Sequence, residues 1–358
     1  MINFYELEFK RVVLHQIVPK SDGLEHATIM PDENLFELND DVVNIIKERL
    51  AKSASKVSKA FEPEIEDYMG GTFFGICETL KDKGDSNFIA STVDIAMLLA
   101  RAQTKNNIPG GSFIFIEAQT KTFKTWYIAI KAEWNKALRY EIHNRQSTIK
   151  LLDDIFLDSS SKNFKVGAIY EKDESGFEVP YPNSLFGAYF YDEQFTIDSK
   201  PAEYFYKDFL GLTLDSLPKI QSMKFFKSTD NFIKTFVDSH ETKDNLLQAL
   251  KQEFMTNEEP SVSPSEFAQM YFHEPDVKNT YMNEVVPYLP KTVQKDSTLI
   301  LNKLEKKRVD FPNNIALTGP ERTFEYSVQI ISSKSEIEDI NFEDDVTILK
   351  IKGKPYQN

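Results

Sequence analysis

The sequence of 358 residues contains a single cysteine, Cys77, so no disulfide can form within one chain. No uninterrupted apolar run approaches the roughly 18 residues that a membrane-spanning helix needs. Residues 2–8 have neither the basic start nor the apolar stretch of an export signal. We therefore expect a cytoplasmic protein that does not engage a membrane.

Motifs that mark common enzyme classes are missing as well. The sequence has no Gly-x-x-x-x-Gly-Lys-Ser/Thr phosphate loop, no Gly-x-Ser-x-Gly elbow and no His-Glu-x-x-His zinc helix. Its five histidines are scattered without paired spacing, and one cysteine cannot build a thiolate metal site. We therefore expect no catalysis, no metal and no cofactor. The Glu-x-Lys pieces Glu8-Phe9-Lys10 and Glu305-Lys306-Lys307 leave a metal-dependent nuclease open as an alternative.

Basic residues are fewer than acidic ones, with 42 Lys and Arg against 56 Asp and Glu, so the chain carries a net charge of −14. Residues 1–150 hold 19 Lys and Arg against 21 Asp and Glu, which leaves 23 against 35 for residues 151–358. The acidity therefore belongs mainly to the second part. Residues 121–150 reverse the sign, with seven Lys and Arg against Glu133 and Glu141. A basic patch on an acidic protein is compatible with DNA binding.

Apolar and aromatic side chains are abundant, with 28 Phe and 15 Tyr, and they supply cores for two or three domains. We expect an α+β protein with a mixed strand and helix N-terminal domain, an α-helical middle region and a strand-rich C-terminal segment. The expected domains are residues 1–155, a strand-containing connector at 156–200, a helical region at 201–295 and a β-rich segment at 296–358.

Periodicity predicts the individual elements. Strands are expected at 9–18, 112–118, 125–131, 164–170, 186–191, 314–318, 323–331 and 345–352, with a polar connector at 158–163. Helices are expected at 40–60, 88–105, 202–210, 218–240 and 244–255, with a short one after Pro264. Gly211 is expected to supply a left-handed C-cap. The Phe225, Phe232 and Phe236 face predicts core packing, with a homodimer interface as the alternative.

Four short segments carry a resemblance across nearly the whole chain. They are Leu14-His15-Gln16-Ile17, Trp126-Tyr127-Ile128-Ala129-Ile130, Lys207-Asp208-Phe209-Leu210-Gly211 and Val346-Thr347-Ile348-Leu349-Lys350-Ile351-Lys352-Gly353. Their order and placement resemble the bacterial nucleoid-associated protein family of the NdpA/YejK type. The resemblance implies a non-catalytic protein of the nucleoid that binds DNA with little sequence specificity. Double-stranded DNA is the expected partner, although no residue pattern distinguishes it from single-stranded DNA. His15, within the first segment, is expected to be a hydrogen-bonded structural residue.

Charge and spacing, and not the family motifs, suggest which residues contact DNA. Lys52, Lys56 and Lys59 lie at i, i+4 and i+7 of the expected first helix and share a face that is either phosphate-binding or simply solvated. The candidates in the second basic stretch are Lys121, Lys124, Lys131 and Arg139. Aromatic residues there, such as Trp126, are expected to pack in a sheet and not to stack on bases.

An alternative function comes from the acidity of the second part. The chain would then be an adaptor subunit of a DNA-processing assembly, such as one containing a topoisomerase, or of an anti-phage defence assembly. The resemblance makes this alternative reasonable, because members of the family are linked to topoisomerase. A homo-oligomer is expected under both hypotheses.

Overall fold

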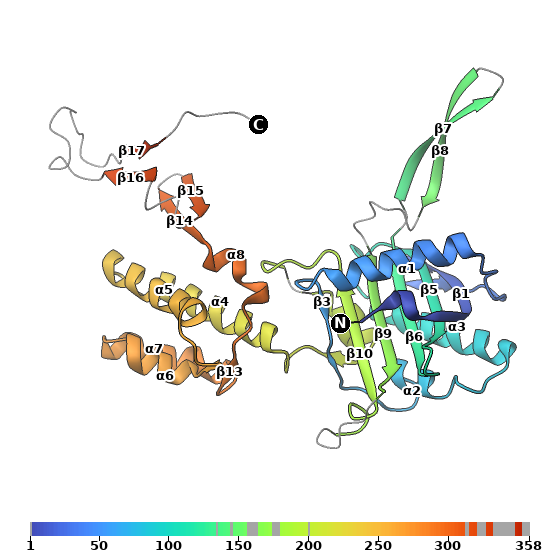
Figure 1. The fold of residues 1–358 in the computed structure, drawn as a ribbon, viewed down its shortest axis with the longest axis horizontal. Coiled ribbons are helices and arrows are strands. Elements are labelled where there is room, and N and C mark those ends of the chain that lie inside the picture. The colour runs from blue at the N-terminus through green and yellow to red at the C-terminus, as the bar shows by residue number, and fades with distance from the viewer. Residues whose placement is uncertain are drawn as a thin grey trace. The chain divides into compact units, whose positions relative to one another are not determined.

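The computed structural model describes residues 2–133, 135–143, 146–155, 164–173, 180–199, 201–311, 315–320, 327–331 and 348–352 (Figure 1). The chain divides into two compact units, residues 1–220 and residues 221–358. Helices and strands are mixed along the chain around one main antiparallel sheet, which confirms the α+β class.

The main sheet of the first unit has the strand order β2-β1-β5-β6-β9-β10-β3 and is antiparallel throughout. Its strands are β1 (Glu8–Val18), β2 (Thr28–Met30), β3 (Ala60–Phe61), β5 (Gly111–Gln119), β6 (Thr125–Ala132), β9 (Phe164–Glu171) and β10 (Phe186–Asp192). The central strands β5 and β6 are buried along nearly their whole length. Strands of this kind need cover on both faces.

Helices supply that cover (Figure 1). On one face α1 (Asp40–Ser55) packs Ile46 and Leu50 into a core with the alternate residues Trp126, Ile128 and Ile130 of β6. The other face carries α2 (Phe73–Glu78), α3 (Asp85–Ala102) and the π-helix η2 (Tyr204–Phe209). Aromatic rings join these elements to the sheet, in the pairs Phe73–Phe115, Phe88–Phe115 and Phe113–Phe209.

Smaller elements complete the first unit. They are η1 (Phe4–Glu6), the pair β4 (Glu64–Ile65) and β11 (Leu212–Thr213), and a separate antiparallel hairpin of β7 (Asn135–His143) and β8 (Gln146–Ile155). Gly211 follows η2 with φ of +66°, and a Cβ at this position would lie 2.9 Å from the Asp67 Cβ. The predicted left-handed cap at Gly211 is therefore confirmed.

The second unit is mainly helical in its first part. Its helices are α4 (Pro218–Phe236), which begins at the end of the first unit, α5 (His240–Met255), α6 (Pro264–Tyr271), α7 (Pro275–Glu284), η3 (Val286–Tyr288), η4 (Ser297–Leu299) and α8 (Leu301–Leu304). Its strands pair as β12 (Ser261–Val262) with β13 (Val293–Gln294), β14 (Lys306–Phe311) with β15 (Ile315–Pro320), and β16 (Val328–Ile331) with β17 (Ile348–Ile351). Phe225 and Phe232 are buried, which confirms core packing for most of the predicted aromatic face, whereas Phe236 is half exposed.

Several predicted boundaries need correction. The first helix ends at Ser55 and not near residue 60, because Lys56 leaves helical geometry and its N–H bonds to the Ser53 carbonyl. The helix predicted to reach residue 240 ends at Phe236, since Ser239 caps a new helix that begins at His240. The β7–β8 hairpin and β14 were not predicted. Residues 158–163 and 321–326 lie outside the described residues.

Candidate nucleic-acid interface

The C-terminal end of α1 carries the first group of predicted cations. Asn39 caps the other end of this helix by accepting a hydrogen bond from the Val42 N–H, and Asp40 and Asp41 complement the positive helix terminus. Lys52 lies in the last turn and forms an i,i+4 ion pair with Glu48 at 2.6 Å. The structure thus places only Lys52 of the three predicted lysines on the helix itself.

Lys56 and Lys59 converge on a single carboxylate. The Lys56 Nζ lies 2.8 Å from Glu193 Oε2, and the Lys59 Nζ lies 3.4 Å from Glu193 Oε1 and also donates to the Glu193 carbonyl. Tyr191 donates its hydroxyl hydrogen to the same carboxylate. Two lysines against one glutamate leave a formal excess of one positive charge. The Glu193 side chain is 12% exposed and the Lys56 side chain is 46% exposed, so a phosphate can approach Lys56 from the solvent.

The turn between β5 and β6 carries the second group. Lys121 is exposed, Lys124 is partly exposed, and Phe123 between them is 76% exposed with φ of +62°. The Lys124 N–H donates to the Thr120 hydroxyl at 3.0 Å, and the Thr122 hydroxyl donates to Asp173 Oδ1 at 3.0 Å. The turn therefore holds an exposed ring between two cations in a fixed, strained backbone conformation.

Sequence reasoning missed Phe123. Charge and spacing single out Lys121 and Lys124 but give no weight to the aromatic residue between them. The sequence signal that could have identified it is a lone phenylalanine in the tetrapeptide Lys121-Thr122-Phe123-Lys124. This tetrapeptide joins two expected strands, and a side chain in such a turn is not expected to be buried in the sheet. The ring is 76% exposed and lies between two lysines, so it is the combination with these charges, and not the exposed ring alone, that makes it a candidate for binding.

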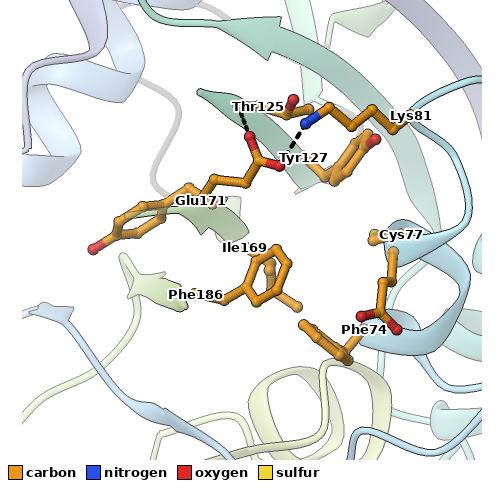
Figure 2. A pocket seen from close by; sticks show the side chains of 10 residues that line it. Phe74, Cys77, Lys81, Thr125, Tyr127, Ile169, Glu171 and Phe186 are labelled. Carbon is orange, nitrogen blue, oxygen red and sulfur yellow. Dashed lines mark hydrogen bonds and ion pairs between the residues drawn. The ribbon is translucent and has the colours of Figure 1, made fainter. Parts of the chain in front are cut away.

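Behind this turn lies a small internal pocket (Figure 2). The Glu171 carboxylate accepts a hydrogen bond from Lys81 Nζ at 2.8 Å and another from the Thr125 N–H at 2.9 Å. Burial alone would raise the pKa of Glu171, but these two hydrogen bonds and the Lys81 charge outweigh it and lower the pKa. Glu171 therefore stays ionised and fixes the first residue of β6 after the turn.

The apolar wall of the pocket consists of Phe74, Cys77, Ile169 and Phe186, as Figure 2 shows. Burial raises the pKa of the Cys77 thiol, and the thiol is therefore protonated at neutral pH. The cavity measures about 40 Å³. That space suits about three water molecules and is too small for a nucleobase. The pocket thus supports the turn from inside and is not itself a nucleotide site.

The two cationic groups lie at opposite ends of the main sheet. Thr125 follows the β5–β6 turn and pairs with Gln119, whereas Ala132 at the other end of β6 pairs with Phe164 of β9. Glu193, the partner of Lys56 and Lys59, follows β10 at that second end, since Asp192 pairs with Lys165. Seven steps along β6 correspond to about 23 Å. The structure therefore forms a turn patch (Lys121, Phe123, Lys124) and a separate helix-end patch (Lys52, Lys56, Lys59).

Lys131 does not belong to either patch, because its side chain is buried and the residue is 2% exposed. Its ammonium donates to the Pro109 carbonyl at 2.8 Å and lies 3.3 Å from the Tyr204 hydroxyl. Burial, followed by the charge of Lys165 opposite it in the sheet, lowers the pKa of Lys131 to about 7. An internal ammonium cannot reach a phosphate backbone, so Lys131 is removed from the set of DNA contacts.

Arg139 lies on β7 opposite Lys150 of β8. Its side chain lies outside the described part of the structure. Strand β6 precedes this hairpin and β9 follows it. The last residue of β6 and the first residue of β9 lie at the end of the sheet where Glu193 lies. Chain connectivity therefore associates Arg139 with the end of the sheet that carries the helix-end patch.

A family model described as nucleoid-associated protein YejK matches residues 13–320. The chain belongs to this family. The YejK match runs from β1 to β15 and includes both patches, and the segments Leu14–Ile17, Trp126–Ile130 and Lys207–Gly211 fall within it. The predicted family is thereby confirmed. A search of curated proteins found no match.

No helix among the residues that the structure describes has the length and apolar character to cross a membrane. Across those same described ranges, no group of three or more His, Cys, Asp and Glu side chains is arranged to hold a metal ion. The Glu8 and Lys10 side chains of the nuclease-like tripeptide pair with each other at 2.6 Å on β1.

Proposed function

We propose that this protein binds double-stranded DNA with little sequence specificity and performs no chemistry on it. The observation that carries the proposal is the turn patch, where Phe123 projects between Lys121 and Lys124. Membership of the nucleoid-associated YejK family supports the same function. A place in the nucleoid follows from the proposal.

The chemistry of the turn patch suits a backbone contact. Lysine ammonium groups neutralise phosphates without reading base edges, so they add affinity without sequence preference. An apolar ring flanked by cations can insert at a base step or lie against the sugar edges of a groove. Because the ring is already exposed and its backbone is held by Thr120 and Thr122, little ordering is needed on binding.

The helix-end patch is proposed as a second, weaker contact. Glu193 offsets part of its charge, and Glu48 offsets Lys52. Phosphates must therefore displace these carboxylates, which lowers the gain from each contact. Patches at the two ends of a sheet whose strand β6 is about 23 Å long can contact different segments of the same duplex or two duplexes. Such separated contacts suit a protein that organises DNA.

The experiment is a fluorescence anisotropy titration of a labelled random duplex at two salt concentrations, with unlabelled DNA of unrelated sequence as competitor. We expect affinity to fall steeply with salt and every competitor to act equally. Lys121→Glu/Lys124→Glu should weaken binding at least tenfold, and Lys52→Glu/Lys56→Glu/Lys59→Glu should weaken it less. The matched control is Lys105→Glu/Lys207→Glu, which reverses two exposed lysines outside both patches.

Two results would count against the proposal. Equal binding by the wild type and by both patch variants would exclude direct contact through these lysines. Absence of any duplex binding at low salt would favour the adaptor hypothesis, in which the chain acts through a topoisomerase or a defence subunit. Homo-oligomer formation is a separate prediction that the elution volume of the pure protein in size-exclusion chromatography tests.

A further inference from the structure

An apolar groove lies between α1, β1 and the segment that precedes α1. Its floor consists of Val12, Ile46 and Ile114, which are all nearly inaccessible to solvent. Its lips are Leu14, Phe36 and Ile45, and the last two are 41% and 49% exposed. The groove encloses about 160 Å³, which is the space that one phenyl or leucyl side chain occupies.

The groove is held open by its backbone and not by loose side chains. The Phe36 N–H donates to the Val12 carbonyl at 2.7 Å, which fixes this lip against the edge of β1. The preceding segment is fixed through His15, whose Nδ1 accepts a hydrogen bond from the Asp32 N–H at 3.0 Å. The other lip, Ile45, is set by the helical position of α1. A preformed apolar groove of this kind suits a ligand that brings its own apolar side chain.

An open acidic hollow adjoins the groove, and Leu14 lines both the groove and the hollow. Its walls include Met30, Asp32, Glu33 and Asn34, and Met30 is 58% exposed. The segment from residue 28 to residue 46 contains five acidic residues and no Lys, Arg or His. The acidic residues are Asp32, Glu33, Glu37, Asp40 and Asp41, all of them exposed. Asp40 and Asp41 complement the N-terminus of α1, and Asp32 Oδ1 accepts a hydrogen bond from the Asn34 N–H at 3.0 Å.

We propose that this groove binds a short peptide segment of a partner protein, in which one large apolar side chain is flanked by lysine or arginine. The apolar side chain would fill the space between Phe36 and Ile45, and the basic residues would face Asp32, Glu33 and Glu37. Nucleic acid is a poor fit, because the five carboxylates repel phosphates. The proposal does not depend on DNA binding, since the groove shares no residue with the turn patch or the helix-end patch.

The test uses the full chain with a fluorescein-labelled probe peptide of sequence Gly-Lys-Lys-Phe-Lys-Lys-Gly. Two control peptides replace either the four lysines by glutamates or the phenylalanine by serine. We expect the probe to bind at low salt and the control peptides to bind at least tenfold more weakly. Ile45→Ser, Phe36→Ala and the exposed charge variant Glu33→Lys/Glu37→Lys should each weaken probe binding at least fivefold.

The matched control variant is Met69→Ser, which removes a side chain that is 69% exposed elsewhere in the first unit. Its probe affinity should equal that of the wild type. A photo-crosslinking residue at position 45 should label the probe, and one at position 69 should not. Equal probe binding by the groove variants and the wild type would overturn the proposal. A crosslink from position 45 to a second copy of this chain, in the presence of the probe, would also overturn it.

Discussion

The imidazole of His15 lies 2.9 Å from the Thr92 hydroxyl through Nε2. Its Nδ1 accepts the Asp32 N–H, so the hydrogen of the neutral ring is on Nε2 and is donated to Thr92. Thr92 passes its own hydrogen to the Ile89 carbonyl. One buried side chain thereby joins β1, α3 and the segment that leads to the apolar groove. The predicted structural role of His15 is confirmed.

The His15 hydrogen bonds predict that stability falls on mild acidification. Burial lowers the pKa of folded His15 from 6.5 to about 4, with partial opposition from the charge of Asp32. Below pH 6.5 the imidazole of His15 binds a proton in the unfolded chain but stays neutral in the folded chain. The free energy of unfolding therefore decreases as the pH falls towards 4. Between pH 7.5 and pH 5 this contribution amounts to about 2 kcal/mol.

Urea denaturation at both pH values checks this prediction, with His15→Gln as the comparison. Glutamine can accept and donate at the same position but does not titrate. The wild type should therefore lose about 2 kcal/mol more than the variant between the two pH values. Parallel losses in the two proteins would show that His15 is not the responsible group.

Replacement of the buried Lys131 should leave DNA binding unchanged. Lys131→Met removes an ammonium that is bonded to the Pro109 carbonyl inside the protein and not exposed to phosphates. We expect its duplex affinity to stay within about twofold of the wild type, while Lys121→Glu weakens binding. The anisotropy titration at low salt measures both. A large loss with Lys131→Met in a variant of unaltered circular dichroism would contradict the assignment.

Removal of the Glu193 charge should strengthen DNA binding. Glu193 pairs with both Lys56 and Lys59, and Glu193→Gln frees their charge while its amide oxygen still accepts hydrogen bonds. We expect an affinity gain of about two- to fivefold at low salt, and a smaller one at high salt. Glu64→Gln, which changes an exposed glutamate on β4, is the control and should have little effect. Unchanged affinity of Glu193→Gln would remove the helix-end patch from the interface.

Phe123 is expected to oppose stability and favour binding. Its φ of +62° is costly for a residue with a Cβ, and the ring is mostly in solvent. Phe123→Gly should therefore keep or raise the free energy of unfolding, by up to about 1 kcal/mol, while duplex affinity falls. Phe123→Ala keeps the backbone strain and should lose affinity equally. Full affinity in both variants would show that the ring does not touch DNA.

Local sequence patterns predict the α+β class and the position of most core strands. Runs of alternating or continuous apolar residues identify β1, β5 and β6 to within two residues at each end. A strand buried on one face needs apolar residues at alternate positions, and a strand buried on both faces needs them throughout, so neighbouring residues suffice for the prediction. The cap at Asn39 and the turn at Gly211 are likewise local signals. Family membership was also accessible, since short segments carry it.

Which basic side chains are free to contact a ligand depends on the packing of distant segments, and local patterns do not predict it. Lys131 and Lys124 look alike in sequence, but cross-strand pairing places Lys131 opposite Lys165 inside the sheet. The approach of Glu193 to Lys56 joins residues 137 positions apart, and no local pattern encodes it. The separation of the two patches follows from strand register, and the groove beside Phe36 follows from the packing of α1 against β1. Burial and charge pairing are long-range properties, so the fold must be known before a basic residue can be assigned a role.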